Sequence, residues 1–268
     1  MLGRQVDTST SSKPQWLHRI VMRQKNFSAV LLILPLISHT VTNARELSAS
    51  NTGAIDAMLS TINKIRANEG LHALVHEETA SLAATLHADE LVGRKLLSHR
   101  NLNGERVAER YRLVGGTGTK AGENLGAGDS IESILIAWVK SPSHRSNLLN
   151  PEWYRVGFGQ ARTDKGRIIL VAIFSNSRWK NSSFEINRGI ATLKGQFLHP
   201  KGIAPPTISI RVGEREIGPV LVRPGARQTT FTFPTPQSWQ DGSVAPILLS
   251  ATESGVTKQV DLLLLKVP

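Results

Sequence analysis

The pattern of apolar and polar residues divides the chain into a part with helical periodicity and a part without it. Between residues 52 and 67, apolar residues recur every three or four positions, which predicts an amphipathic helix. These residues are Ile55, Met58, Leu59, Ile62 and Ile65. Gly70 follows, where a helix commonly ends in a left-handed residue. A second helix is predicted over 77–95, and Leu82, Ala83 and Leu86 are its expected apolar face.

The region from 100 to 128 has little periodicity and contains seven glycines. It is therefore predicted to be a long loop with one helical turn near 107–113, and such loops are usually functional or disordered. Two further helices are predicted, one beginning at Asp129 or Ser130 and one over 143–149 after Pro142. Strands are predicted at 154–161 and 167–175, joined by a turn.

Helical periodicity disappears from about Phe184 onward. Short apolar or alternating segments follow, separated by turn residues such as Pro224-Gly225, and this spacing predicts an antiparallel β-sandwich. The segments are 190–197, 207–212, 219–222, 228–233, 246–251 and 258–266. The chain is thus expected to be of the α+β class, with a helix-and-strand domain at 45–178, a linker at Trp179–Ser183 and a β-sandwich domain at 184–268.

The N-terminal segment has the composition of an export signal. Basic residues precede an apolar run over 27–37, and Thr42-Asn43-Ala44 is a small-residue site for cleavage after Ala44. The run is shorter than the roughly 20 residues of a membrane span. Residues 1–44 are therefore interpreted as a signal peptide with an N-terminal extension, the start being Met1 or Met22, and an uncleaved signal anchor is the alternative. The protein is expected to be secreted or periplasmic, with no stable transmembrane span after signal removal.

Composition narrows the function classes. The chain has no cysteine, which excludes a disulfide framework, a cysteine nucleophile and a cysteine-ligated zinc. It also has no GxxxxGK[ST] loop, which argues against a P-loop nucleotide hydrolase. The net charge of +11 is spread along the chain without a Lys/Arg run longer than two, so no nucleic acid partner is expected. A basic exterior favours anionic envelope polymers or lipid head groups.

Three polar groups carry the candidate chemistry: Ser98-His99, Gly122-Glu123-Asn124-Leu125, and the run from Ser141 to Pro151. That run reads Ser-Pro-Ser-His-Arg-Ser-Asn-Leu-Leu-Asn-Pro and follows Trp138. Together with Leu86–Glu90 and the strand Arg155–Gly159, these motifs resemble the CAP superfamily, also called the SCP domain. This family contains cysteine-rich secretory proteins, antigen 5 and plant pathogenesis-related 1 proteins. The resemblance is closest to its small bacterial branch and covers about 52–176.

The resemblance implies an alpha–beta–alpha sandwich with a cleft that holds two histidines and two acidic residues, and that binds zinc in some members. Carried over by motif, His99, Glu123 and His144 occupy three of these four positions. The place of the second acid is Ser141, and this departure argues against a four-ligand site. Some family members in other kingdoms bind sterols or lipids.

Two functions from different classes stay open. The first is an exported binding module whose cleft engages a small ligand, lipid, glycan or cell-envelope component. The cleft residues expected to take part are His99, Glu123, Asn124, Ser141, His144 and Asn147. The second is a metal-dependent hydrolase in which His99, Glu123 and His144 hold zinc, which would acidify a bound water. Whether the chain is an enzyme is left open, and the missing fourth acid favours binding.

The residues also allow a metal-free cleft in which Glu123 holds one or both imidazoles by hydrogen bonds. A serine hydrolase is disfavoured because no GxSxG elbow is present. Other side chains are given structural roles. Ser141 is expected to be a helix N-cap, His87 a packed or capping histidine, His72 a surface residue, and Trp138 and Trp153 core residues. Arg145 is expected either to bind a carboxylate or phosphate with two hydrogen bonds or to pair with a carboxylate such as Glu152.

Overall fold

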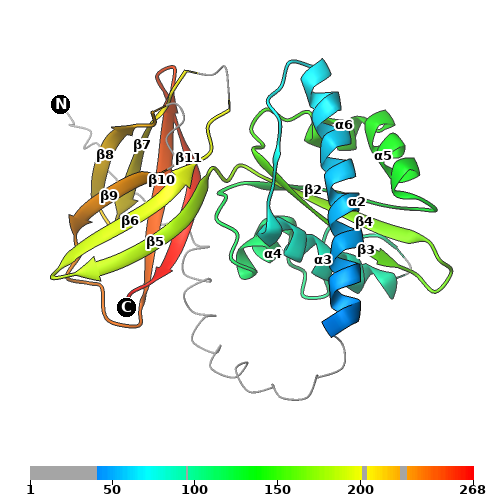
Figure 1. The fold of residues 1–268 in the computed structure, drawn as a ribbon, viewed down its shortest axis with the longest axis horizontal. Helices are drawn as coiled ribbons and strands as arrows, with labels where there is room; N and C mark the ends of the chain where they lie inside the picture. Colours follow the sequence, from blue (N-terminus) through cyan, green and yellow to red (C-terminus); the bar gives the residue numbers. More distant parts are fainter. Residues whose placement is uncertain (1–40, 95, 201–203, 224–227) are drawn as a thin grey trace, which may run out of the picture. The chain divides into compact units, whose positions relative to one another are not determined.

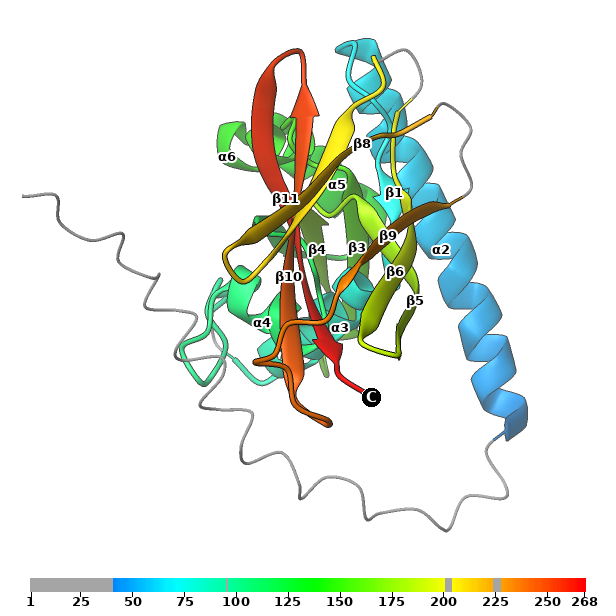
Figure 2. The ribbon, with the colours of Figure 1, turned by 90° about the vertical axis from the view of Figure 1, so that its left-hand side faces the viewer.

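The computed structural model describes residues 41–94, 96–200, 204–223 and 228–268 (Figures 1 and 2). The predicted signal peptide and N-terminal extension cover residues 1–44. Of these, residues 1–40 lie outside the described residues. Residues 52–268 form one unit, and the description below concerns this unit. Among the described residues, no helix combines the length and apolar character needed to cross a membrane.

A four-stranded sheet between two helical layers forms the first part of this unit (Figure 1). Its strand order is β1-β3-β4-β2, with β1 parallel to β3 and the other pairs antiparallel. The strands are β1 (Val75–His76), β2 (Ala121–Gly128), β3 (Arg155–Arg162) and β4 (Ile168–Ser175). All eight residues of β4 are buried, because both faces of the strand are covered.

The two faces of β4 belong to different cores. Ile168, Leu170, Ala172 and Phe174 pack with residues of α2, α5 and α6, whereas Ile169, Val171 and Ile173 pack with α3 and α4. The helices are α2 (Val41–Asn68), α3 (Glu78–Val92), α4 (Val107–Leu113), α5 (Ile131–Lys140) and α6 (Pro142–Leu148). The expected alpha–beta–alpha sandwich is therefore confirmed.

Local signals placed the helix ends well. Gly70 has φ +70° just beyond α2, and the amide of Leu71 donates to the carbonyl of Arg66 at 3.0 Å, which is the hydrogen bond of a left-handed C-cap. Ser130 is the N-cap of α5, since its hydroxyl accepts from the amide of Ser133 at 3.1 Å.

The predicted apolar face of α3 was right for Ala83, which is buried, but wrong for Leu82 and Leu86. Leu82 and Leu86 are 50% and 55% exposed, and the buried face consists mainly of alanines. The reason lies on β3, where a Cβ at Gly157 or Gly159 would collide with the backbone of α3. The helix approaches the sheet so closely at these glycines that the small residues Ala80 and Ala84 lie there, and Leu82 and Leu86 are turned outward.

The long-loop prediction was wrong for residues 121–128, which form strand β2 beside β4. The glycines here serve close packing rather than turns. A Cβ at Gly126 would lie 3.0 Å from atoms of both Ile134 and Trp138, and one at Gly128 would lie 2.9 Å from Ile134. Glycine in this strand thus lets α5 lie directly against the sheet.

The second part is a β-sandwich of two antiparallel sheets, with orders β11-β10-β7-β8 and β5-β6-β9 (Figure 2). The strands are β5 (Trp179–Asn187), β6 (Ile190–Phe197), β7 (Thr207–Val212), β8 (Arg215–Leu221), β9 (Thr229–Pro234), β10 (Val244–Glu253) and β11 (Val256–Lys266). The predicted linker Trp179–Ser183 is instead the first half of β5. Its Trp179 is buried in the core, and Gly195 lies beneath the indole ring.

Asp261 on β11 connects the β-sandwich to the segment before β2. Its carboxylate is fully buried and accepts from the hydroxyls of Thr117 and Ser177, both at 2.7 Å. It also accepts from the amides of Arg178 and Trp179, both at 2.9 Å. Backbone bonds run alongside, including the amide of Leu262 to the carbonyl of Thr117 at 2.7 Å. The helix-and-strand part and the β-sandwich are therefore joined by hydrogen bonds, and the buried carboxylate of Asp261 accepts several of them.

Candidate functional site

Residues from three separate elements and a loop form the candidate site. His99 lies in the loop between α3 and α4, and Glu123 lies on β2. His144 lies on α6, and Ser141 occupies the position before that helix. Arg110, which the sequence interpretation did not include, comes from α4. The fold thus brings together side chains that are up to 45 positions apart in the chain.

Glu123 is the centre of a charged cluster. Its side chain is buried, and one carboxylate oxygen accepts from His99 Nδ1 at 2.7 Å. The other oxygen accepts from Arg110 Nη2. The buried Arg110 also donates from Nη1 to the carbonyls of His99 and Glu105, both at 2.9 Å. Arg110 therefore holds both the carboxylate and the backbone of the histidine that contacts it.

The imidazole of His99 is oriented by this carboxylate. Donation from Nδ1 leaves Nε2 as the nitrogen that can face a ligand. The hydrogen bond that His99 donates to Glu123 raises the pKa of His99, while partial burial and the nearby Arg110 oppose that effect. The side chain is 62% exposed. The pair thus presents a solvent-accessible imidazole that is charged over a wider pH range than a free histidine.

His144 lies in a different environment. Its Nδ1 is 2.9 Å from Ser141 Oγ, and its ring stacks on Trp138 with centroids 6.3 Å apart. Desolvation lowers the pKa of His144, and the charge of His99 lowers it further. The site therefore contains two imidazoles whose pKa values are shifted in opposite directions.

Ser141 differs from its predicted role in one respect. It occupies the N-cap position of α6, but its side chain makes no capping hydrogen bond. Its hydroxyl instead lies 2.9 Å from His144 Nδ1 and 3.2 Å from Ser143 Oγ. The position that lacks the family's second acid is therefore occupied by a neutral partner of His144.

The two predicted asparagines connect β2 to α6. Asn124 is fully buried and donates from Nδ2 to the carbonyl of His144 at 3.0 Å. Asn147 donates from Nδ2 to the carbonyl of Glu123 at 3.0 Å and to Asn124 Oδ1 at 3.1 Å. Both amides thus hold the backbone of the residues that carry the chemistry.

The three predicted zinc ligands do not fit a metal ion in this arrangement. Both oxygens of Glu123 are bonded, one of them to a guanidinium that would repel a divalent cation. Within the described ranges, no group of three or more His, Cys, Asp or Glu side chains could hold a metal. The alternative in which Glu123 holds an imidazole by a hydrogen bond is the one observed, and it involves His99 alone.

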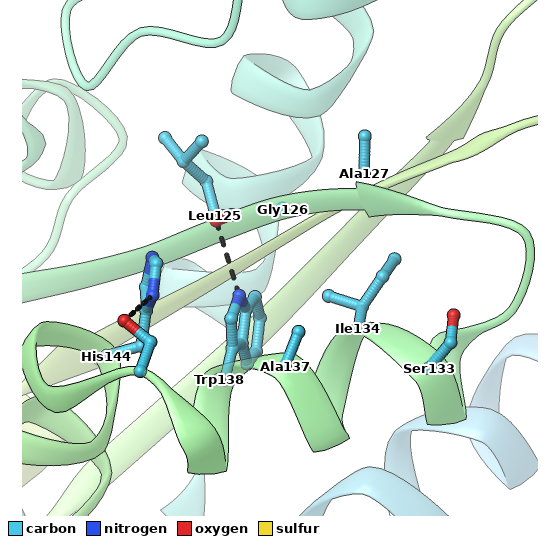
Figure 3. Close-up of a pocket in the computed structure, with 9 residues that line it drawn as sticks. Leu125, Gly126, Ala127, Ser133, Ile134, Ala137, Trp138 and His144 are labelled. Atoms are coloured by element: carbon cyan, nitrogen blue, oxygen red, sulfur yellow. Dashed lines mark hydrogen bonds between the residues drawn. The ribbon is translucent and has the colours of Figure 1, made fainter.

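A cavity of about 240 Å³ lies beside His144, between β2 and α5 (Figure 3). Its walls are mostly apolar, with Trp138 and Ile134 directed toward Leu125 and Gly126 across the opening in Figure 3. The indole of Trp138 donates to the carbonyl of Leu125 at 3.3 Å. The full lining is Leu125, Gly126, Ala127, Ser133, Ile134, Ala137, Trp138, Ser141 and His144. The cavity thus has apolar walls and a polar end at His144 and Ser141.

The histidines and tryptophans to which the sequence assigned structural roles can now be compared with the structure. The packed role of His87 is confirmed, because this buried ring bonds to the carbonyl of Ser98 at 2.8 Å and so supports the loop of His99. His72 is not a surface residue, since it bonds to the carbonyl of Trp153 and stacks on Tyr154. Trp138 and Trp153 are core residues, as expected.

Arg145 pairs with a carboxylate, as one of its two predicted roles required, but the partner is not Glu152. Arg145 pairs with Glu69 at 2.7 Å, because α6 lies beside the C-terminal end of α2. Glu152 is bonded instead to Lys120 and Lys258, at 2.7 and 3.0 Å.

Comparison with known proteins agrees with this architecture. A family model described as CAP, the cysteine-rich secretory protein family, matches residues 59–174. The uncharacterized protein YkwD of Bacillus subtilis is 27% identical over 120 residues, which cover 44% of this chain and 47% of YkwD. This chain therefore spans about half the length of that relative. An uncharacterized protein of Borreliella burgdorferi is 25% identical over 124 residues, 46% of this chain and 79% of that protein.

Among solved structures, an outer surface protein from Borrelia burgdorferi is 24% identical with a TM-score of 0.42, covering 45% of this chain and 90% of that one. The family match and the motifs around His99, Glu123 and His144 coincide on the same segment. Residues 59–174 therefore match the CAP family, and this segment is called the CAP domain below.

Proposed function

We propose that this chain is an exported CAP-family protein that binds a small ligand with an apolar part and an acidic group. The observation that carries the proposal is the cavity of about 240 Å³ with apolar walls and His144 at its polar end. Binding sites for small molecules are typically concave and mostly apolar, with a few placed polar groups that orient the ligand. The export part of the proposal rests on the composition of residues 1–44.

The imidazoles indicate the sign of the ligand's polar group. His99 and His144 are near enough for the charge of one to lower the pKa of the other. Each uses Nδ1 within the protein, so Nε2 of each can face the ligand. The pKa of His99 is raised, whereas that of His144 is lowered, so His99 keeps its positive charge to higher pH than His144 does. A carboxylate or phosphate on the ligand is the group that this arrangement favours.

The hydrogen bonds of Glu123 favour ligand binding over hydrolysis. Glu123 has both oxygens engaged and is buried behind His99 and Arg110, so it is poorly placed to activate a water. A hydrolase using His99, Glu123 and His144 on zinc would also need Arg110 to release the carboxylate. The metal-dependent hydrolase is therefore the weaker of the two candidate functions.

Octanoate and 1-octanol are suitable probes, because they share an apolar chain and differ in charge. We expect octanoate to shift the indole N–H resonance of Trp138 and to bind more tightly than octanol. Ala137→Phe would fill the cavity and abolish this shift, whereas Ala67→Phe, at an exposed position on α2, would leave it unchanged. Equal binding by wild type and Ala137→Phe would contradict the proposal.

The same titration tests a second location. A larger apolar cavity of about 570 Å³ lies between α2 and α5, lined in part by Met58, Ile65 and Leu135. It contains no histidine in its lining. A probe that shifts the methyl resonance of Met58 but not the indole of Trp138 would show that the ligand binds there, and would overturn the assignment to the His144 cavity.

A further inference from the structure

Residues 117–119, between α4 and β2, pair with the edge of the β-sandwich and are called the clamped segment below. The amide of Leu262 on β11 donates to the carbonyl of Thr117 at 2.7 Å, and Gly118 forms an antiparallel bridge with Asp261. The strand β11 lies at the edge of its sheet, which has the order β11-β10-β7-β8. The clamped segment therefore covers a strand edge that would otherwise be open.

Side chains hold the clamped segment as well. Thr117 Oγ1 donates to the buried carboxylate of Asp261 at 2.7 Å, and Thr119 Oγ1 donates to the carbonyl of Gln259 at 2.9 Å. Asn176, which follows β4, donates from Nδ2 to Thr119 Oγ1 at 2.9 Å. The clamped segment is therefore fixed to β11 by both backbone and side-chain hydrogen bonds.

The clamped segment also contacts α4. The hydroxyl of Tyr111 accepts from the amide of Gly118 at 3.4 Å, and Arg112 donates from Nη2 to the carbonyl of Thr119 at 3.2 Å. Just before the segment, a Cβ at Gly116 would collide with the ring of Tyr111, so the backbone lies directly against this ring. A shift of α4 relative to the clamped segment would break these contacts.

Arg110, one residue before Tyr111, is the part of α4 that reaches the candidate site. Its guanidinium donates to the carboxylate of Glu123 and to the carbonyl of His99. The helix has seven residues, so its position depends on tertiary contacts rather than on its own stability. A path of direct contacts therefore runs from Asp261 through the clamped segment to Arg110.

The clamped segment also lies between the two charged partners in the chain. Arg110 and Glu123 are 13 positions apart, with α4 before the segment and β2 after it. A displacement of the segment would therefore move the ends of both elements that carry this ion pair. A joint that only tied the β-sandwich to the CAP domain could be attached anywhere on its surface, whereas this one is attached between the partners.

We propose that the β-sandwich positions the candidate site, and that Asp261 and Thr117 are the positioning residues. By holding the clamped segment, they place α4 where Arg110 reaches Glu123, and the fixed carboxylate in turn orients His99. Neither Asp261 nor Thr117 lines the cavity beside His144. The inference rests on the proposed function only in treating His99 as part of a ligand site, because the positions of these side chains can be measured without a ligand.

Thr117→Val and Thr117→Ser in the full chain form the central pair of variants. Valine keeps the shape of threonine without the hydroxyl, whereas serine keeps the donor to Asp261. Long-range proton–nitrogen NMR measures the ring nitrogen shifts of His99, which report its hydrogen bond to Glu123. We expect Thr117→Val to move these shifts toward those of a free histidine, and Thr117→Ser to leave them as in wild type. In Thr117→Val, the amide of Leu262 should also exchange with solvent about tenfold faster.

Two variants in the β-sandwich complete the set. Asp261→Asn takes an acceptor oxygen from the other end of the same hydrogen bonds, and it should change the His99 shifts in the same direction as Thr117→Val. Phe233→Leu is the matched control, because Phe233 is buried in the sandwich core on β9, in the sheet that does not contain β11. This variant should lower the stability of the β-sandwich and leave the His99 shifts unchanged.

Each other outcome contradicts the proposal. If the Leu262 amide exchanges faster in Thr117→Val but the His99 shifts stay the same, the segment opens without affecting the site. If the Leu262 amide is unchanged, Thr117 does not hold the segment. An equal change at His99 in Phe233→Leu would reflect stability alone. Octanoate titration of the wild type is the separate test of the proposed function, and its failure would leave the NMR result on His99 standing.

Discussion

Two buried carboxylates, Glu123 in the CAP domain and Asp261 in the β-sandwich, have opposite surroundings. Glu123 is bonded to a guanidinium and an imidazole, and that imidazole is largely exposed. Asp261 is fully buried and accepts four hydrogen bonds from two hydroxyls and two backbone amides. The first carboxylate is balanced by charged partners and the second by neutral donors.

This difference distinguishes a site that can meet a ligand from one that is closed. Through His99, the charge of Glu123 influences a group that solvent and ligands can reach. Asp261 has no such exposed partner among its four donors, so its hydrogen bonds serve to join the β-sandwich to the segment before β2. Burial raises the pKa of Asp261, although its hydrogen bonds oppose the rise. A buried charge is thus by itself no sign of a functional site, and the exposure of its partner is the better guide.

The largest effect is expected from Asp261→Ala. The substitution removes the acceptor of four hydrogen bonds, three of them buried, and we expect a loss of about 3–5 kcal/mol in the free energy of unfolding. Urea unfolding followed by tryptophan fluorescence measures this loss. Asp241→Ala, at an exposed position of the same β-sandwich, is the control and should cost little. A loss below about 1 kcal/mol would show that the neutral donors at this junction find other partners.

Glu123→Gln should have the next largest effect. It leaves the buried guanidinium of Arg110 without a charged partner, at a cost of about 2–3 kcal/mol. It should also lower the pKa of His99, because the hydrogen bond that His99 donates to the Glu123 carboxylate is the main cause of the raised pKa. Urea unfolding and histidine NMR measure the two effects, with Glu132→Gln on the exposed side of α5 as control. If the variant loses the expected 2–3 kcal/mol but the pKa of His99 does not change, Glu123 stabilises the fold through Arg110 without setting the pKa of His99.

The third prediction concerns the pH dependence of the two imidazoles. Because the pKa of folded His99 is raised, its pairing with Glu123 stabilises the folded state below the ordinary histidine pKa, and this contribution disappears as pH rises through the folded value. For His144 the sign is reversed. Its lowered pKa gives a contribution that is present above the ordinary value and is lost as pH falls toward the folded one.

Proton–carbon NMR of the histidine rings measures both values directly. We expect His99 to titrate at higher pH than His144 in wild type. In Glu123→Gln the two titrations should move closer together. If His144 titrates above His99 in wild type, the description of the charged cluster is wrong.

The smallest effect is expected from Ser141→Ala. It removes one partially exposed hydrogen bond to His144, which is worth about 0.5–1 kcal/mol. The nitrogen chemical shifts of His144 should change because the tautomer is no longer held by the hydroxyl. Ser60→Ala, at an exposed position of α2, is the control and should leave these shifts unchanged.

Much of the fold follows from local patterns. Ser130 begins α5 and Gly70 follows α2 as predicted, because a cap depends only on a few neighbouring residues. The strands β6 and β7 have the predicted bounds. In contrast, the first half of β5, Trp179–Ser183, was predicted as a linker, since the burial of Trp179 depends on Gly195 of the neighbouring strand.

The candidate site was predictable only in part. The motifs predicted His99, Glu123 and His144 as cleft residues, and the structure places Glu123 beside one of the two histidines. Arg110 has no motif of its own, and only the packing of α4 against β2 shows that it is the second partner of the carboxylate. That partner is what makes the three-ligand zinc site unsuitable.

By itself, the sequence determined the helices and most of the strands, the CAP motifs and the residues able to carry chemistry, because these depend on periodicity and on residue type. The tertiary structure decided which side chains meet and which face outward. Gly126 and Gly128 belong to a strand because α5 lies against them, and Leu86 is exposed because α3 lies too close to Gly157 and Gly159. Such outcomes depend on distances between elements that are far apart in the chain, and no local pattern contains them.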